Sequence, residues 1–375
     1  MTPLKVLHVV SVDKENYYLN NLADHSDAGE VDYSFVTFAS ADCDFVRDFE
    51  RRGRRVFGLG CMSRRDYPKA YRMLGKLYRE LDADIVHTHL FDASLIGLTV
   101  AKRQGRKTVL TRHHSDAVHE IASPMKRRFY LALENYISRH ADQIIAPSQM
   151  VRDFLVEKEG VPDEKVTIIP YGQTTERFDN VTPEAVEAVR RELGMGGGTA
   201  MVNVSRLFHR KGHQYLFEAF ADLVKGGLDA KLYLVGDGDH RAALEAMCRE
   251  TGIADRVKFL GWRNDALAVV AASDIVVHPS LEDALSSAVI EAVMLEKPII
   301  ATDISGVRDS LGNGKYGRIV PPADAAAFRE AISETLNNID AAREAARQGR
   351  KYLLEYMDAT RVANQYLEIY KRLTN

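Results

Sequence analysis

Short runs rich in β-branched residues alternate with longer amphipathic stretches along the whole chain of 375 residues. The runs are nearly continuous in apolar character, as in strands that are buried on both faces of a parallel sheet. We expect such strands at residues 5–11, 33–39, 56–59, 85–89, 108–112, 143–147, 166–170, 200–205, 231–235, 257–260, 275–278, 299–302 and 318–320. The stretches between them have the length and period of helices, for example 125–140, 214–225 and 239–252. This alternation predicts an α/β fold of doubly wound domains.

A chain of this length can form two domains, each with its own core. A charged helix expected at Thr182–Leu193 is followed by a glycine-rich loop at residues 194–198, which is typical of a domain boundary. We therefore expect one Rossmann-like domain at residues 1–178 and a second at 179–356. The last helix, roughly Asp358–Leu373, could pack on either domain.

The composition indicates a cytoplasmic protein that does not bind nucleic acid. The net charge is only −3, and the three cysteines have neither metal-site nor disulfide-framework spacing. The N-terminus lacks a signal-peptide pattern, and no run approaches eighteen apolar residues.

A basic stretch at Arg47–Arg79 stands out against this average, with eleven Lys or Arg and three acidic residues. Its later part interleaves tyrosines and leucines with basic residues, which predicts an amphipathic helix able to lie on an anionic membrane. The alternative is an ordinary solvated helix face. Attachment would place the protein peripherally on the inner face of the plasma membrane.

The segment His278–Pro298 carries two carboxylates, Asp283 and Glu291, around a loop that leads into a helix. A helix start offers free N–H groups and a partial positive charge, so it can hold a phosphate. Carboxylates beside it are suited to hydroxyl groups, and phosphate with hydroxyls indicates a nucleotide sugar. The amides that would bind the phosphates belong to Leu285, Ser286 and Ser287. For Asp283 the alternative is a helix-entry acid favoured by the dipole.

Further candidates follow strands of the second domain. Arg206 and Lys211 share one strand-to-helix loop, where a guanidinium and an ammonium would suit a diphosphate. Gly236 and Gly238 would permit close approach of a ligand, although Gly-Asp-Gly is also a plain turn. Trp262 could meet a nucleobase or be a half-buried structural residue. Because open α/β sheets bind ligands at the carboxyl ends of their strands, we expect the two domains to face each other across a cleft.

In order and spacing, these motifs resemble glycosyltransferase family 4, the retaining enzymes of GT-B fold. The resemblance rests on Ser205-Arg206-Leu207 with Lys211-Gly212-His213, Val235-Gly236-Asp237-Gly238, Phe259-Leu260-Gly261-Trp262, and Pro279-Ser280 with Asp283-x7-Glu291-Ala292. Landmarks of the first half agree: His87-Thr88-His89, Thr111-Arg112-His113, residues 141–148 and residues 165–172.

The resemblance implies a role for each residue. Arg206 and Lys211 would hold the diphosphate, Glu291 the ribose, and Asp283 the hydroxyls of the transferred sugar. His113 would lie near sugar and acceptor, although a lone histidine is more often structural and His114 is its neighbour. The last helix, 357–375, would pack back on the first domain.

Two departures from the family pattern concern the site. The family usually has Glu at the first carboxylate, whereas Asp283 aligns here and Glu282 comes one residue early. Either the donor differs slightly or Glu282 shares the role. The first loop, Ser11–Asn16, lacks the Gly-Gly pair common in the family, and we expect it to shape acceptor choice.

The implied activity is retaining transfer of a hexosyl unit from a nucleotide-diphosphate sugar to a glycan or lipid-linked hydroxyl, in the synthesis of cell-envelope polysaccharide or glycolipid. UDP-sugars are favoured, with GDP-mannose next. No Asp-x-Asp motif occupies a suitable loop, so we expect neither a cofactor nor an essential metal. The alternatives are a nucleotide-sugar epimerase of the same fold and a non-catalytic nucleotide-sugar-binding protein.

Overall fold

The computed structural model describes residues 2–113, 118, 121–283 and 285–375. The chain divides into two compact units: unit 1 is Met1–Gln173 with Met357–Asn375, and unit 2 is Thr174–Tyr356. The boundary between the units, at Gln173–Thr174, therefore lies a few residues before the expected boundary at 178. The reason is the short helix α7 (Glu176–Asp179), whose Arg177 and Asp179 form ion pairs with residues of unit 2.

The core of unit 1 is a parallel seven-stranded sheet in the order β3-β2-β1-β4-β5-β6-β7. Its strands are β1 (Leu4–Val10), β2 (Val31–Thr37), β3 (Arg55–Gly58), β4 (Ile85–His89), β5 (Lys107–Thr111), β6 (Gln143–Ala146) and β7 (Val166–Ile168). Each expected strand of this half is confirmed, with ends that differ by at most two residues.

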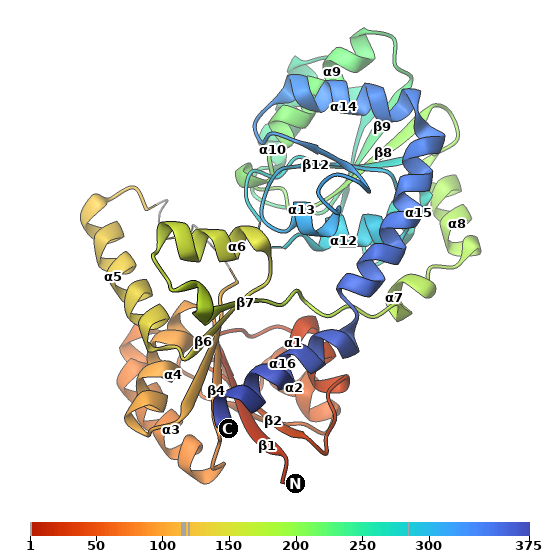
Figure 1. Ribbon diagram of the computed structural model, residues 1–375. Coiled ribbons are helices and arrows are strands. Elements are labelled where there is room, and N and C mark those ends of the chain that lie inside the picture. Colours follow the sequence, from red (N-terminus) through yellow and green to blue (C-terminus); the bar gives the residue numbers. More distant parts are fainter. Residues whose placement is uncertain (1, 114–117, 119–120, 284) are drawn as a thin grey trace. The chain divides into compact units, whose positions relative to one another are not determined.

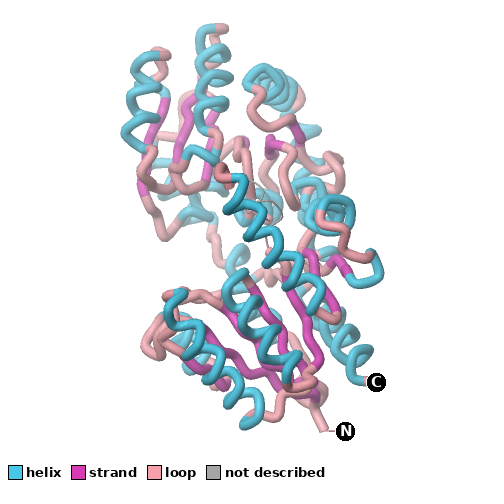
Figure 2. The backbone as a smooth tube through the Cα atoms, turned by 90° about the vertical axis from the view of Figure 1, so that its left-hand side faces the viewer, coloured by secondary structure: helices cyan, strands magenta, loops and turns pink. Residues whose placement is uncertain are grey.

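Helices lie on both sides of these strands (Figure 2). In the described part of unit 1 they are α1 (Tyr17–Asp24), α2 (Asp44–Arg51), α3 (Tyr67–Glu80), α4 (Phe91–Arg103), α5 (Pro124–His140), α6 (Gln149–Asp153) and α16 (Ala359–Thr374). Among the described residues, no helix is both long and apolar enough to cross a bilayer.

The C-terminal helix α16 completes the core of unit 1, beside α1 and the strands β1 and β4 (Figure 1). Tyr366 and Tyr370 are fully buried there, and the Tyr366 hydroxyl lies 2.5 Å from that of Tyr18. Asp358 caps the helix by accepting a hydrogen bond from the amide of Arg361.

Unit 2 repeats the architecture with a parallel six-stranded sheet in the order β10-β9-β8-β11-β12-β13. Its strands are β8 (Thr199–Val204), β9 (Ala230–Val235), β10 (Val257–Gly261), β11 (Ile275–His278), β12 (Ile299–Thr302) and β13 (Arg318–Val320). The expected strands of this half are confirmed too.

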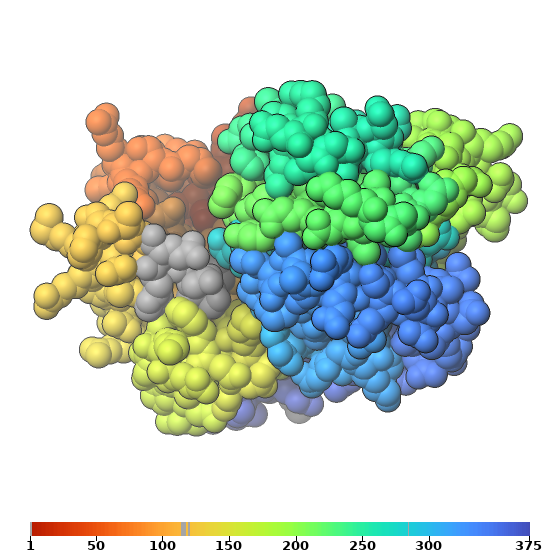
Figure 3. Space-filling view, turned by 90° about the horizontal axis from the view of Figure 1, so that it is seen from above, coloured from red at the N-terminus to blue at the C-terminus, as the bar shows by residue number. Residues whose placement is uncertain are grey.

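The described helices of unit 2 are α7, α8 (Pro183–Leu193), α9 (His213–Lys225), α10 (Arg241–Glu250), α11 (Ala266–Ala272), α12 (Ser287–Met294), α13 (Val307–Ser310), α14 (Ala325–Asn337) and α15 (Ile339–Tyr356). Helices α9 and α14 lie side by side although about a hundred residues separate them in the chain, and the green and blue surfaces adjoin in Figure 3. Phe217, Phe220 and Phe328 fill the core beneath them.

Both sheets contain the strand order 3-2-1-4-5-6 of doubly wound domains, which unit 1 extends by a seventh strand, so in each sheet the order of strands reverses beside the first strand. The reversal lies between β1 and β4 in unit 1 and between β8 and β11 in unit 2. Ligands of such sheets bind beyond the carboxyl ends of the strands at this point.

Part of the apolar face expected on α3 belongs to the protein core, whereas attachment of the basic stretch Arg47–Arg79 to a membrane stays a prediction. Leu74 and Tyr78 are fully buried and Leu77 nearly so, in a cluster with β1, β4 and α4. The helix expected in the later part of the stretch is confirmed as α3, and the earlier part contains α2 and β3. Because Leu74, Leu77 and Tyr78 fill the protein core, α3 cannot insert these side chains into a bilayer.

Candidate active site

The switch point of unit 2 brings together the two loops that carry the predicted cations and carboxylate. Arg206 and Lys211 follow β8, and Asp283 follows β11, the strand that pairs with β8. The loops are joined directly, since the amide of Leu281 donates to the carbonyl of Arg210 at 2.8 Å.

Gly212 makes this close approach possible. It has a φ of +66°, and a Cβ atom there would lie 2.0 Å from the carbonyl oxygen of Pro279. Any other residue would force the two loops apart.

Lys211 and Asp283 form a partly buried ion pair. The ammonium lies 2.7 Å from the Asp283 carboxylate, and only 11% of the Lys211 side chain is exposed. His278, at the end of β11, lies 3.9 Å from the same carboxylate oxygen. Burial lowers the pKa of His278 to about 4 despite the opposing effect of Asp283, so this imidazole is neutral at pH 7.

Glu282 faces a different cation. Its carboxylate lies 3.8 Å from the guanidinium of Arg210, whose side chain is 41% exposed. Of the two neighbouring acids, it is Asp283 that contacts Lys211.

Helix α12 begins beside this pair. Its N-cap residue Ser286 does not cap the helix, because its hydroxyl is hydrogen-bonded to His278 at 3.0 Å. Leu285 and Ser286 are buried, whereas Ser287 is exposed. Without a side-chain cap, the first amides of the helix keep the capacity to bind an anion.

Glu291, one turn into α12, pairs with Arg177 of α7 at 3.2 Å. Its side chain is only 14% exposed, and burial raises its pKa while Arg177 opposes the shift. Arg177 holds the carboxylate in place and favours its charged form, as a hydrogen-bond acceptor for a diol requires.

The glycines of the next loop serve the protein's own packing. A Cβ atom at Gly236 would lie 2.1 Å from the carbonyl oxygen of Ser205, and one at Gly238 would lie 2.4 Å from that of Leu207. The close contacts that require glycine at these two positions are therefore with the loop after β8. A ligand-binding role for these two glycines stays a prediction.

Arg206 and Trp262 are both exposed. The guanidinium of Arg206 lies 5.0 Å from the ring centre of Phe208, and within the described residues it pairs with no carboxylate. Trp262 is 78% exposed, which excludes the half-buried structural role. Its contact with a nucleobase remains a prediction.

In unit 1, His113 lies just beyond the end of β5 and lines a cavity of about 310 Å³. The rest of the lining comes from the end of β5, the start of α4, the segment before α5 and α5 itself, and its apolar residues include Leu90, Phe91, Ile121 and Ile137. At its wall, Arg112 forms ion pairs with Glu134 and Glu159. The neighbouring His114 lies outside the described residues.

Both ring nitrogens of His113 have partners. Nδ1 lies 2.5 Å from the hydroxyl of Tyr171, and Nε2 lies 3.2 Å from Nδ1 of His89.

Sequence reasoning missed Arg177 and His278. His278 ends a strand in the same segment as Asp283, and that position was the available signal. Arg177 has no sequence signal, because it lies 114 residues from its partner Glu291.

Comparison with known proteins places both halves of the chain. Residues 16–177 match the family described as Glycosyltransferase Family 4, and residues 187–352 match Glycosyl transferases group 1. Among solved structures, HepE of Anabaena in complex with UDP has a TM-score of 0.83 at 20% identity, covering 98% of this chain and all of that one.

Two characterised relatives are similar over most of their length. The 2-deoxystreptamine glucosyltransferase of Streptomyces kanamyceticus is 27% identical over 85% of both chains. A UDP-Gal:α-D-GlcNAc-diphosphoundecaprenol α-1,3-galactosyltransferase of Escherichia coli is 26% identical over 70% of this chain and 69% of its own. Both are transferases, which favours neither an epimerase nor a non-catalytic binding protein. The chain thus belongs to the group 1/family 4 glycosyltransferases of GT-B fold and is itself a glycosyltransferase.

Proposed function

We propose that this enzyme moves a hexosyl unit from a nucleotide-diphosphate sugar to a hydroxyl of a glycan or lipid-linked acceptor, in the synthesis of cell-envelope polysaccharide or glycolipid, with retention at the anomeric carbon. The observation that carries the proposal is the Lys211–Asp283 pair beside Arg206 and the start of α12. UDP is the favoured nucleotide, because the E. coli relative is named for UDP-Gal and HepE was solved with UDP and with UDP-glucose. GDP-mannose is the next candidate.

Different residues of unit 2 then bind different parts of the donor. Arg206, Lys211 and the amides of Leu285, Ser286 and Ser287 bind the diphosphate, and Glu291, held by Arg177, accepts hydrogen bonds from the ribose. Asp283 exchanges its contact with Lys211 for the hydroxyls of the sugar, while the ammonium turns to the phosphate. Gly236, Gly238 and Trp262 are the predicted neighbours of the nucleotide, and Glu282 is a second predicted contact to the sugar.

Transfer would follow a front-face route without an enzyme nucleophile. The bond from the anomeric carbon to the diphosphate oxygen breaks, and the acceptor oxygen forms its new bond on the same face. The acceptor proton passes to the departing diphosphate oxygen. The developing negative charge is then stabilised by Arg206, Lys211 and the start of α12.

These groups would replace a metal ion, so we propose no essential divalent cation. Full activity is expected in excess chelator. Complete loss that added metal restores would refute this part of the proposal.

The acceptor side is assigned to the cavity of unit 1 next to His113. Its apolar lining and the Arg112 ion pairs at its wall suit an acceptor with both apolar and polar parts. The loop Ser11–Asn16, the predicted second determinant of acceptor choice, follows β1 and is held in place by the Asn16 cap of α1 and by the ion pair of Lys14 with Asp44 at 3.0 Å.

Membrane attachment, if the acceptor is lipid-linked, is assigned to the start of α5 rather than to α3. Met125 and Phe129 are 84% and 60% exposed there, next to Lys126, Arg127 and Arg128. Anionic vesicles should co-sediment with the protein and release it with salt, and M125S/F129S should weaken binding. M62S is the matched control, since Met62 is 62% exposed elsewhere in unit 1. Equal, salt-insensitive recovery with neutral and anionic vesicles would exclude this face.

The function itself is tested by a thermal-shift panel of nucleotide diphosphates and their sugars. A ligand that binds the folded site stabilises it by mass action and so raises the melting temperature. At a ligand concentration of a hundred times Kd, the unfolding free energy increases by about 2.7 kcal/mol. UDP and a UDP-sugar should stabilise the protein most, and the sugar should be consumed only when an acceptor is present. Stabilisation by no nucleotide, or product formed from the donor alone as an epimerase would form it, would refute the proposal.

A further inference from the structure

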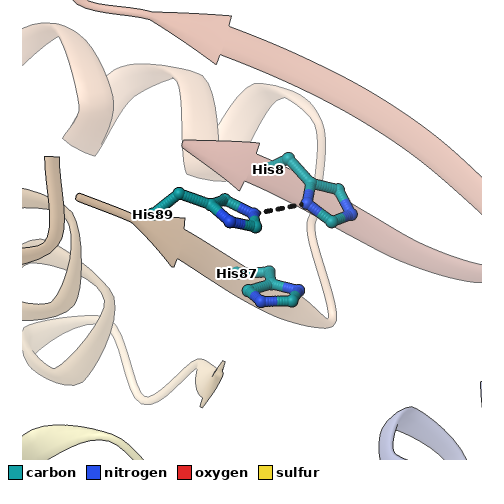
Figure 4. Close-up of side chains that lie close together, drawn as sticks. All are labelled: His8, His87 and His89. Atoms are coloured by element: carbon teal, nitrogen blue, oxygen red, sulfur yellow. Dashed lines mark hydrogen bonds between the residues drawn. The ribbon is translucent and has the colours of Figure 1, made fainter. Parts of the chain in front are cut away.

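Three histidines are buried at the switch point of unit 1. His8 lies on β1, His87 and His89 lie on β4, and their exposed fractions are 0%, 0% and 2%. His8 and His87 occupy paired positions of the two strands, and His89 reaches back to His8 (Figure 4).

Two of these rings form a continuous hydrogen-bonded row with His113. His8 Nδ1 lies 2.9 Å from His89 Nε2, and His89 Nδ1 lies 3.2 Å from His113 Nε2. His113 Nδ1 is 2.5 Å from the hydroxyl of Tyr171. We call His8, His89 and His113 the histidine row.

A neutral imidazole has one N–H and one lone pair, so all links of the row must point the same way. The rings of His8 and His89 are neutral, because burial lowers the pKa of His8 to about 3 and that of His89 well below its usual value. The direction of a single hydrogen bond at either end of the row therefore determines which nitrogen of every ring carries the proton.

The chemistry of the outer end makes Tyr171 the donor. A phenol O–H is a stronger hydrogen-bond donor than a neutral imidazole N–H, and an imidazole nitrogen accepts better than a phenol oxygen, so the 2.5 Å contact of the Tyr171 hydroxyl with His113 Nδ1 favours donation by Tyr171. At the other end, His8 Nε2 has no hydrogen-bond partner among the described residues, so that end of the row does not set its direction.

We propose that His8 and His89 are positioning residues, which hold His113 beside the acceptor cavity with its proton on Nε2 and its Nδ1 accepting from Tyr171. The three rings then all carry their protons on Nε2. The row is not a proton relay, because a proton passed inward would create an imidazolium at His8, in the fully buried end of the row.

The cluster is also poorly arranged for a metal ion. His8 and His89 share a proton rather than two converging lone pairs, and both nitrogens of His87 are taken by Tyr370 and Thr111 at 2.7 and 2.8 Å. No carboxylate of the described residues belongs to the group to balance a buried dication.

The tautomers can be observed directly in long-range proton–nitrogen spectra of the full-length protein labelled with 15N-histidine. His8, His89 and His113 should each show a protonated Nε2 and an unprotonated Nδ1, unchanged on addition of Zn²⁺. A protonated Nδ1 on any of the three, or a shift of their nitrogens by Zn²⁺, would overturn the proposal. This measurement needs no variant and no activity.

Variants of His89 then test the link to catalysis, which rests on the proposed function. H89L removes the acceptor of the His113 N–H, so His113 should show mixed tautomers and kcat should fall roughly ten- to hundredfold, with the donor KM unchanged. H89N keeps an acceptor oxygen near the position of Nδ1 and should restore both. A loss in H89L with the His113 tautomer intact, or no rescue by H89N in a folded protein, would refute the positioning role. Donor-induced thermal stabilisation of the same variants reports on the proposed function separately.

Discussion

Lys211 shows how one residue couples burial to chemistry. An ammonium with little exposure is costly unless a negative partner is close, and Asp283 is that partner at 2.7 Å. A diphosphate could take over this role and leave Asp283 available for hydroxyl groups. The Asp283 carboxylate thus occupies the position beside Lys211 that we propose for the diphosphate.

Replacing Lys211 tests this idea. K211A should lower kcat by roughly 10²–10³, the usual cost of removing one preorganised group that stabilises developing charge. The measurement is the initial rate of sugar transfer under saturating donor. R210A is the matched control, because Arg210 is the adjacent cation but lies on the exposed side near Glu282. A similar loss in both variants would mean that the general basic charge matters and not the Lys211 position.

Replacing Glu291 tests its proposed contact with the ribose of the donor. E291Q keeps the shape but weakens acceptance from the ribose and leaves Arg177 without its ion pair, so the donor Kd should rise about tenfold, roughly 1.4 kcal/mol. Isothermal titration with the nucleotide diphosphate measures it. E296Q, two residues beyond the end of the same helix, should bind like the wild type. Unchanged affinity in E291Q would place the ribose elsewhere.

At the scale of elements, the loops after β8, β9 and β11 form one framework. Gly212, Gly236 and Gly238 let these loops touch through backbone atoms, and His213 contributes a hydrogen bond to Ser205 at 3.0 Å. The glycines that resembled a ligand-binding signature are thus part of the support of the site.

Helix α16 makes the stability of unit 1 depend on the end of the chain. Y366A should cost about 3–5 kcal/mol, as removal of a large buried aromatic side chain does. Urea denaturation, followed through the transition of unit 1, measures the loss. E368A on the exposed face of the same helix should change stability by less than about 0.5 kcal/mol. Equal effects of both would show that the helix is not packed as described.

At the scale of the molecule, buried neutral histidines couple stability to pH. Their pKa values are lowered by burial, to about 3 for His8 and His213, to about 4 for His278, and well below the usual value for His87 and His89. The unfolded chain therefore binds more protons below pH 6.5, so their stabilisation is present above that pH and is lost as the pH falls.

The unfolding free energy should accordingly decrease between pH 7 and pH 5, approaching about 1.4 kcal/mol per pH unit for each of these histidines. Urea titrations at several pH values give this slope. A free energy that is flat or rises on acidification over this range would contradict the neutral burial of these histidines.

Much of the fold could be predicted because its signals are local. A strand buried on both faces is a short β-branched run, and all thirteen expected strands were found with ends that differ by at most two residues. Because Lys211 and Asp283 follow strands of one sheet, the sequence also predicted that their loops meet at one edge of that sheet, and the two side chains pair there. The exposure of Trp262 and the burial of the apolar side chains of α3 could not be predicted, because residue type alone does not determine how exposed a side chain is.

The sequence by itself determined the alternation of strands and helices, the two sheets and the family, because hydrophobic period and loop motifs are properties of neighbouring residues. Only the tertiary structure decided which groups became partners. Arg177 reached Glu291, the apolar face of α3 entered the core, and His8 and His89 lined up with His113. Such contacts join residues far apart in the chain, and their energies depend on distance and burial, which no local pattern contains.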